Sequence, residues 1–382
     1  MSESDLPEQL RIRREKRESL LSRGIAPYPV SVNRTASLRE IRERFKDLAT
    51  DSPSGVIESV AGRRPKVLKS VRQTFDKYDF IEVETPMLQV MHGGAAARPF
   101  KTFSNAYDMD LFLRIAPELF LKRCVVGGIE KVFEINRNFR NEGADSSHSP
   151  EFAMLEMYWA YADWQNMKSL TQEIIQNAAL AIFGSHKVQH HDGRISDLGG
   201  EWRELDFYSA ISEAAGLTVT PATSRQELVN IAEKAGLKVD PAWINGKLAE
   251  EIFEHFYSGK LNTPTFVMGF PVDTSPLVRE HRSVKGIAEK WDLYIDGFEL
   301  ATGYSELIDP VIQRDRLLEQ AKLGAKGDLE AMQVDEDFLR AMEHGMPPMG
   351  GVGMGIDRLL MALTGLGIRE TILFPLVKPD EN

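Results

Sequence analysis

Apolar side chains recur at helical spacing in several parts of the chain. In the clearest case, residues 65–79, one helical face carries Val67, Leu68, Val71, Phe75 and Tyr78. Pro65 suits the first turn of this helix, where a backbone N–H has no helical partner. Helices are also expected at 5–23, 163–183 and 313–343, and residues 186–260 are expected to be mainly helical with loops.

Alternating apolar and polar residues predict strands elsewhere. Residues 80–85 alternate and stop at Pro86, and residues 151–161 place Phe152, Met154, Glu156 and Tyr158 on one face. Further strands are expected at 130–136, 264–272, 291–306 and at the start of the glycine-rich stretch 350–362. Strands gathered around one site, with helices packed outside, indicate an α+β domain on a largely antiparallel sheet.

Composition narrows the class of protein. The chain has 382 residues, 42% of them hydrophobic, which is enough for two or three domains or for one large domain with an appendage. No apolar run reaches the roughly 18 residues of a membrane span. The start has no basic region followed by an apolar one, and the single cysteine, Cys124, cannot form an internal disulfide. We therefore expect a cytoplasmic protein.

The net charge of −11 argues against non-specific binding of nucleic acid. A local basic segment coexists with it, because residues 11–23 contain Arg11, Arg13, Arg14, Lys16, Arg17 and Arg23 against Glu15 and Glu18. Two interpretations stay open for this segment: a solvated helix face, or a helix that contacts nucleic acid.

Residues 139–156 carry the strongest chemical signal. Arg140 precedes Glu142 by two residues, and His148, Phe152 and Glu156 follow after a polar turn. A guanidinium can clamp a phosphate, an aromatic face can stack on a purine, and carboxylates can hold an ammonium. The alternative for the Arg-x-Glu pair is an ordinary surface ion pair.

Two further segments suit a nucleotide and its metal ion. Glu299 and Glu306 lie seven residues apart, and a bulge at Gly303 would let both carboxylates reach one cation such as Mg²⁺. The alternative is two solvated acids on a strand edge. In the run Gly350–Arg358, glycines leave room for a nucleotide, and Arg358 can reach a phosphate. A dinucleotide loop would need a βαβ unit, which residues 363–382 cannot supply.

Other candidate site residues also have simple structural explanations. Glu118 follows an Ala-Pro step, so it can act at a helix N-terminus or bind a ligand ammonium. Glu156 on a buried face needs a cation, which could be a ligand or an arginine from elsewhere in the fold. The adjacent His190 and His191 lack a second pair of metal ligands, so zinc is not expected.

These segments together resemble class II aminoacyl-tRNA synthetases. Phe139–Glu142 resembles motif 2, residues 65–86 motif 1 and Gly350–Arg358 motif 3, while Arg114–Leu119 resembles the lysyl-tRNA synthetase branch. The resemblance implies a class II catalytic domain, with an antiparallel sheet flanked by helices, and a homodimer formed through motif 1. It also favours tRNA contact by the basic helix.

The resemblance assigns roles to single residues. It implies that Arg140 binds the ATP α-phosphate and Arg358 the γ-phosphate, and these are the expected catalytic residues. The implied ATP-binding residues are Arg140, Glu142, His148, Phe152, Glu299 and Arg358. The implied lysine-binding residues are Gly94, Glu118, Glu156, Tyr158, Tyr304 and Glu306. Glu299 and Glu306 are the implied Mg²⁺ ligands. The family often has Asn at the position of Thr302, so one amide donor is absent here.

The resemblance implies ATP-dependent activation of L-lysine to lysyl-adenylate and transfer to tRNA through its acceptor end. Residues 65–382 would form the catalytic domain. Residues 1–64 would hold the amino-terminal helix and a remnant of the anticodon-binding region, because an OB barrel needs five strands and this segment offers one. Anticodon recognition is therefore not expected. The alternatives are a barrel-less paralogue that transfers lysine to another acceptor, and a non-catalytic binding protein.

Overall fold

The computed structural model describes residues 8–24, 62–325 and 330–376. The chain forms two compact units, Met1–Pro53 and Ser54–Asn382. In the first unit the described element is helix α1, Glu8–Ser22. The single strand that the sequence offers for a remnant of the anticodon-binding barrel lies outside the described residues. The domain boundary after residue 64 therefore stays a prediction.

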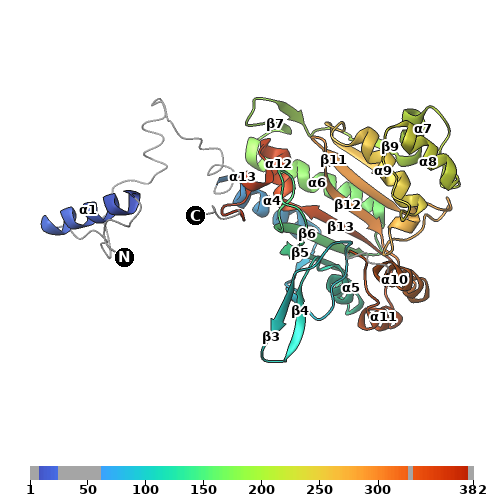
Figure 1. Cartoon of the computed structure of the whole chain (residues 1–382), viewed down its shortest axis with the longest axis horizontal. Helices are drawn as coiled ribbons and strands as arrows, with labels where there is room; N and C mark the ends of the chain where they lie inside the picture. Colours follow the sequence, from blue (N-terminus) through green and yellow to red (C-terminus); the bar gives the residue numbers. More distant parts are fainter. Residues whose placement is uncertain (1–7, 25–61, 326–329, 377–382) are drawn as a thin grey trace. The chain divides into compact units, whose positions relative to one another are not determined.

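The second unit is built on an eight-stranded sheet in the order β1-β5-β6-β13-β12-β11-β10-β9 (Figure 1). In that order, the strands are Ile81–Glu82, Lys131–Phe139, Glu151–Ala160, Met349–Gly355, Phe298–Ser305, Lys290–Ile295, Thr265–Met268 and Arg203–Asp206. Every pairing from β5 to β10 is antiparallel, and the outermost pairs, β1–β5 and β10–β9, are parallel. The expected α+β fold on a largely antiparallel sheet is confirmed.

Three helices pack with this sheet in one hydrophobic core: α4 (Arg64–Lys77), α6 (Trp164–Phe183) and α12 (Ile356–Thr364). Val67, Val71 and Phe75 of α4 are fully buried, as the periodicity predicts. Helix α6 begins where the Asp163 side chain accepts hydrogen bonds from two backbone N–H groups of its first turn. The predicted helices 65–79 and 163–183 are confirmed within a few residues.

A group of helices lies between β9 and β10 in the sequence and has a core of its own. It consists of α7 (Phe207–Ala215), α8 (Arg225–Lys234) and α9 (Asn245–Tyr257), which gather beside β9 in Figure 1. A third core joins the sheet to α5 (Glu118–Val126), α10 (Pro310–Ala325) and α11 (Glu336–Glu343). The helical stretch expected at 313–343 is thus two helices.

The remaining elements are small. A three-stranded sheet contains β2 (Leu88–Gln89), β3 (Lys101–Ser104) and β4 (Met109–Leu113), and a two-stranded sheet contains β7 (Lys187–Gln189) and β8 (Ile195–Asp197). A single 3₁₀ turn, Val272–Thr274, and the short helix α13, Ile368–Thr371, complete the described chain. Residues 186–206 are therefore strands and loops, which corrects the mainly helical expectation for the start of 186–260.

The hairpin β11–β12 supplies one wall of the site described below. Its turn is Asp296–Gly297, and both residues have positive φ, 54° and 83°. This is the geometry that an Asp-Gly pair favours in a two-residue hairpin. The register shifts between Leu293 and Tyr294, opposite Leu300. The bulge expected at Gly303 is therefore wrong: Gly303 pairs regularly with Trp291, and a Cβ there would lie 2.2 Å from the Trp291 ring.

Candidate active site

A cavity of about 470 Å³ opens over β6, β12 and β13. Every residue that the sequence assigns to ATP or lysine lines it, except Glu306: Gly94, Glu118, Arg140, Glu142, His148, Phe152, Glu156, Tyr158, Glu299, Tyr304 and Arg358. Phe152, Met154, Glu156 and Tyr158 of β6 line it together, so the predicted shared face is confirmed. The sheet register thus brings segments far apart in the sequence to one cavity.

Arg140 follows β5 and has the properties of an anion site. Its Nε is buried and has no hydrogen-bond partner among the described residues. No carboxylate in that part of the chain lies within 4.0 Å of its guanidinium. The guanidinium carbon lies 5.1 Å from the centroid of the Phe152 ring. Burial lowers the pKa of Arg140, and the charge of Glu142 opposes that shift, so a bound anion would relieve the desolvation.

A second guanidinium is fixed on the same cavity by the first turn of α12. Arg358 Nη1 donates to the backbone carbonyl of Glu299 at 2.6 Å, and its Nη2 lies 3.3 Å from Nε2 of His148. The other ring nitrogen of His148 is 2.9 Å from Asp145. Hydrogen bonds from Ser147 and His148 lower the pKa of the Asp145 carboxyl. The motif 2 turn and the motif 3 helix therefore meet at His148.

The other end of the cavity is acidic and dry. Glu118, Glu156 and Tyr158 are 6%, 4% and 2% exposed. Glu156 accepts a hydrogen bond from the Tyr158 hydroxyl at 3.2 Å, and no cation of the described residues lies within 4.0 Å of it. Burial, and next the charge of Glu118, raise the pKa of Glu156 well above its usual value. Among these residues no arginine pairs with Glu156 within 4.0 Å, although the charge of Arg140 offsets part of the rise in its pKa.

Glycines determine how closely the walls of the cavity approach each other. Gly94 has φ of 88°, and a Cβ there would lie 2.9 Å from Cβ of Glu118. Gly351 of β13 lies against Glu306 and Tyr158, where a Cβ would be 2.0 Å from Glu306 Oε1. The glycines of motif 3 therefore accommodate side chains of the acidic region, in addition to the room that the sequence reserves for ATP.

Glu306 lies elsewhere than the sequence predicts. Its carboxylate pairs with the fully buried ammonium of Lys122 at 2.6 Å, and the same ammonium is 2.5 Å from Glu118. Burial opposes the charge on Lys122, but the two glutamates outweigh it and raise the Lys122 pKa. Glu299 instead lines the main cavity. Glu306 does not line this cavity in this structure, and its role as a metal ligand beside Glu299 stays a prediction.

Sequence reasoning missed Asp292 as a candidate. Asp292 lies on β11 opposite Thr302, which donates a hydrogen bond of 2.5 Å to it, and both line the cavity with Glu299. Burial raises the pKa of Asp292 to about 7, and Lys290 is its ion-pair partner at 3.1 Å. The Asp-Gly turn alone would have paired Asp292 with Ala301; the bulge at Leu300 shifts the pairing to Thr302, so no local signal gives this contact.

A divalent cation fits this donor set in chemistry, because hard carboxylate oxygens suit Mg²⁺. Asp292 and Glu299 supply carboxylates to one cavity, and the charge of Glu299 adds to the rise in the pKa of Asp292 that burial causes. No group of three or more His, Cys, Asp or Glu is clustered tightly enough to bind a metal by itself in the described ranges.

The cavity and the sheet define the class of protein. The family model for class II tRNA synthetases (D, K and N) matches residues 39–378. The chain belongs to this family. A lysine–tRNA ligase of Kineococcus radiotolerans is 58% identical over 361 residues, which are 94% of this chain and 72% of that protein. A lysine–tRNA ligase of Mycolicibacterium gilvum is 54% identical over 365 residues, 95% of this chain and 72% of that protein.

A third relative is named for a different function. A lysylphosphatidylglycerol biosynthesis bifunctional protein of Nocardia farcinica is 49% identical over 343 residues, 89% of this chain and 30% of that protein. The shared region is therefore a much smaller part of this relative than of the two lysine–tRNA ligases. Among the helices that the structure describes, none is long and apolar enough to cross a membrane.

Proposed function

We propose that this protein activates L-lysine with ATP to lysyl-adenylate and transfers the lysyl group to tRNA. One observation carries the proposal: a single cavity holds, at one end, an arginine against an aromatic ring and, at the other, a buried glutamate, and neither has an ion-pair partner within 4.0 Å in the described ranges. These are the groups that a phosphate next to a purine and a long cationic side chain require. The names of the lysine–tRNA ligase relatives support the same substrate.

The first step needs positioning and charge neutralisation. The lysine carboxylate attacks the α-phosphorus, a new P–O bond forms to the acyl oxygen, and the bond to the leaving pyrophosphate breaks. No general base is required, because the carboxylate is ionised at neutral pH. Arg140 would hold the α-phosphate and Arg358 the γ-phosphate, with Glu142 and His148 on the nucleotide and Phe152 on the adenine.

Mg²⁺ would supply further neutralisation of the phosphates when bound. Glu299 and Glu306 are its predicted ligands, and Asp292 offers a further carboxylate in the same cavity as Glu299. Glu118, with Gly94 leaving room beside it, would hold the α-ammonium of lysine. Glu156, Tyr158 and Tyr304 would surround the ε-ammonium. Amino acids with apolar side chains would leave Glu156 buried without a partner, so they would be rejected.

The proposal includes a homodimer formed through the motif 1 segment. Apolar side chains there are unusually exposed for a folded surface: Ile81 by 52%, Leu88 by 52% and Val90 by 67%. Exposed apolar groups that lie together favour contact with another protein surface. A second copy of this chain would cover them, which analytical ultracentrifugation tests directly.

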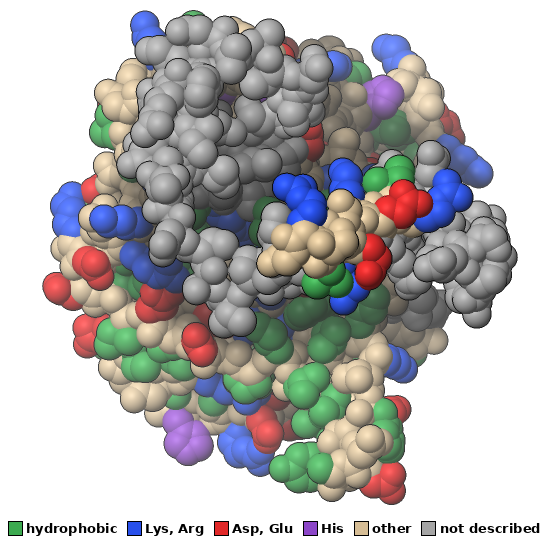
Figure 2. Space-filling model, turned by 90° about the vertical axis from the view of Figure 1, so that its left-hand side faces the viewer, with side chains coloured by type: hydrophobic (Ala, Val, Ile, Leu, Met, Phe, Trp, Pro, Cys, Tyr) green, Lys and Arg blue, Asp and Glu red, His purple; other side chains and the backbone are tan. Residues whose placement is uncertain are grey.

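Transfer to tRNA would use the acceptor end. On the face drawn in Figure 2, Lys and Arg side chains are interspersed with Asp and Glu side chains. In α1, Arg11 pairs with Glu15 at 3.9 Å and Arg17 with Glu18. Both interpretations of the basic helix, a solvated face and a tRNA contact, therefore stay open.

Lysine-dependent exchange of pyrophosphate into ATP, tried with each amino acid in turn, tests the first step. Assays of lysyl transfer to tRNA and to phosphatidylglycerol then compare the two acceptors. The lipid is included because the Nocardia relative is named for lysylphosphatidylglycerol biosynthesis. We expect exchange with lysine and charging of tRNA. Exchange without tRNA charging would favour the alternative of another acceptor. No exchange with any amino acid would favour a non-catalytic binding protein.

A further inference from the structure

Lys122 has no role in the function proposed so far, although its position is unusual. It lies on α5 one helical turn after Glu118, and its side chain is fully buried. Its ammonium contacts Glu118 at 2.5 Å and Glu306 at 2.6 Å, and it lies 5.9 Å from the centroid of the Tyr158 ring. A buried ammonium is costly unless acids surround it, so these contacts hold the side chain in one place.

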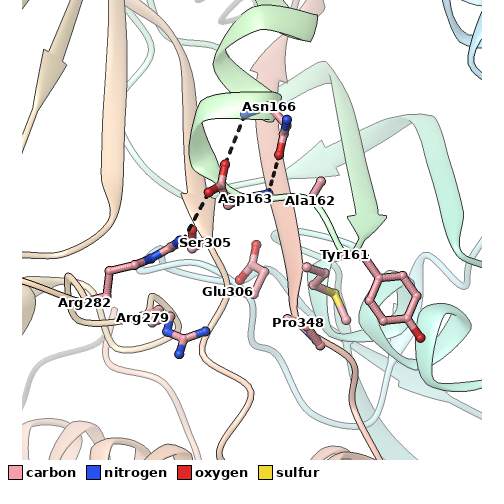
Figure 3. Close-up of a pocket in the computed structure, with 10 residues that line it drawn as sticks. Tyr161, Ala162, Asp163, Asn166, Arg279, Arg282, Ser305, Glu306 and Pro348 are labelled. Carbon is pink, nitrogen blue, oxygen red and sulfur yellow. Dashed lines mark hydrogen bonds and ion pairs between the residues drawn. The ribbon is translucent and has the colours of Figure 1, made fainter.

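Glu306 has no other cation to balance its charge. It also lines a second cavity, of about 320 Å³, which Figure 3 shows with Arg279 and Arg282 on its wall. Arg282 pairs with Asp163 and Glu289, and Arg279 forms no ion pair with Glu306 within 4.0 Å. Lys122 is therefore the one described cation in contact with Glu306, and Gly351 confines the carboxylate on its other side.

The charges of the acidic region can be counted. Glu118, Glu156 and Glu306 supply three carboxylates, and Lys122 supplies one resident ammonium. When all three of these acids are ionised, two negative charges are left among these four side chains, which equal the two ammonium groups of a diamino acid. A neutral amino acid brings one ammonium and leaves one carboxylate unpaired in a dry site, which is unfavourable.

We propose that Lys122 is a positioning residue that determines specificity: it neutralises one of three converging acids and fixes Glu118, so that the pocket accepts a diamino acid. The inference rests on the proposed function. Without Lys122, Glu306 and Glu118 repel each other, and Glu118 loses the contact that aims it at the α-ammonium. Binding of the amino acid should suffer, whereas the phosphate groups at Arg140 and Arg358 should not.

The test uses Lys122→Met, which keeps the length of the side chain and removes its charge. Pyrophosphate exchange should show a KM for lysine raised about tenfold or more, as expected for loss of a hydrogen bond to a charged group. The KM for ATP should stay within about twofold, and kcat should change less than the KM for lysine. A purely structural defect would lower the active fraction, and hence kcat, without this split between the two substrates.

Two further variants keep the test decisive if Lys122→Met folds poorly. The double variant Lys122→Met with Glu306→Gln removes both charges of the pair, and it should recover part of the lost lysine affinity. Lys168→Met is the matched control, because Lys168 is a largely buried lysine that pairs with Glu204 away from the cavity. It should leave the KM for lysine unchanged. Thermal melting monitors folding of all three variants.

The outcomes separate the inference from the function it rests on. A wild-type protein that exchanges with lysine, together with a folded Lys122→Met variant of unchanged lysine KM, overturns the inference alone. An increase in both KM values, or a double variant weaker than the single one, also overturns it. If the wild type neither catalyses lysine-dependent pyrophosphate exchange nor binds lysine in calorimetry, the proposed function is wrong, and the inference about Lys122 is wrong as well.

Discussion

Replacement of Glu156 by glutamine tests the selection of lysine most directly. The substitution keeps the shape of the side chain and its hydrogen bond with Tyr158, and it removes one charge. Glu156 is 4% exposed, so an ε-ammonium that reaches it is desolvated as well. Breaking a buried ion pair costs about 3–5 kcal/mol. Since about 1.4 kcal/mol is a factor of ten, kcat/KM for lysine should fall by about 100-fold to 1,000-fold or more.

The assay is lysine-dependent pyrophosphate exchange at fixed, saturating ATP. A second measurement follows the pH dependence of lysine binding. Burial and the charge of Glu118 raise the pKa of Glu156, so the carboxyl holds a proton at pH values where an exposed glutamate is ionised. Lysine binds the ionised form, and its affinity should therefore rise with pH up to the raised pKa. The Glu156→Gln variant should lose that part of the rise.

Glu204→Gln is a suitable control, because Glu204 carries its charge on the surface and pairs with Lys168. It should keep the wild-type kinetics. Unchanged kcat/KM for lysine in a folded Glu156→Gln variant would refute the assignment of the ε-ammonium to this end of the cavity. It would leave the interpretation of the phosphate end unaffected.

Other perturbations address the phosphates, the packing and the pH dependence of stability. Arg140→Ala should lower the kcat of pyrophosphate exchange by about 100-fold to 1,000-fold, because it removes a hydrogen-bond donor to the charge that develops on the α-phosphate. Arg140→Lys should recover little of the lost rate. A wild-type rate in Arg140→Ala would contradict the role of this guanidinium. Gly303→Ala should lower the free energy of unfolding in urea by about 1–3 kcal/mol, because the new Cβ would clash with the ring of Trp291. Gly324→Ala, on the exposed side of α10, is the control and should not destabilise the fold. Equal unfolding midpoints for the two variants would contradict the expected clash. Burial raises the pKa of Glu306 to about 7 in the folded state. The folded protein thus keeps a proton that the unfolded chain loses above about pH 4, so thermal stability without ligand should fall from pH 5 to pH 8, and a flat profile would contradict that pKa.

Most of the phosphate end could be predicted from the sequence. Arg140, Glu142 and His148 lie in one turn, so their proximity needs little knowledge of the fold. The face of β6 followed from the two-residue period of a strand, which placed Phe152, Glu156 and Tyr158 together. Helices α4 and α6 followed from apolar periodicity over many residues, where the pattern is least ambiguous.

The acidic end depends on contacts between distant segments. In the sequence, Lys122 is an ordinary residue of a predicted helix. Its partner Glu306 lies far away in the sequence, directly after β12. Asp292 and Thr302 face each other because a bulge at Leu300 shifts the register of one hairpin by one residue, and the ring of Trp291 lies against Gly303 further along the same pair of strands. Local spacing suggested that Glu299 and Glu306 share a metal ion, but it could not show that Glu306 also pairs with Lys122.

By itself the sequence determined which chemical groups the protein carries and which of them are neighbours within a single turn or strand. The tertiary structure alone decided which acids are already neutralised and which are left for a ligand. The physical reason is that a charge in a dry site is governed by its nearest counter-ion, and that neighbour comes from whichever distant element the packing brings within a few ångströms.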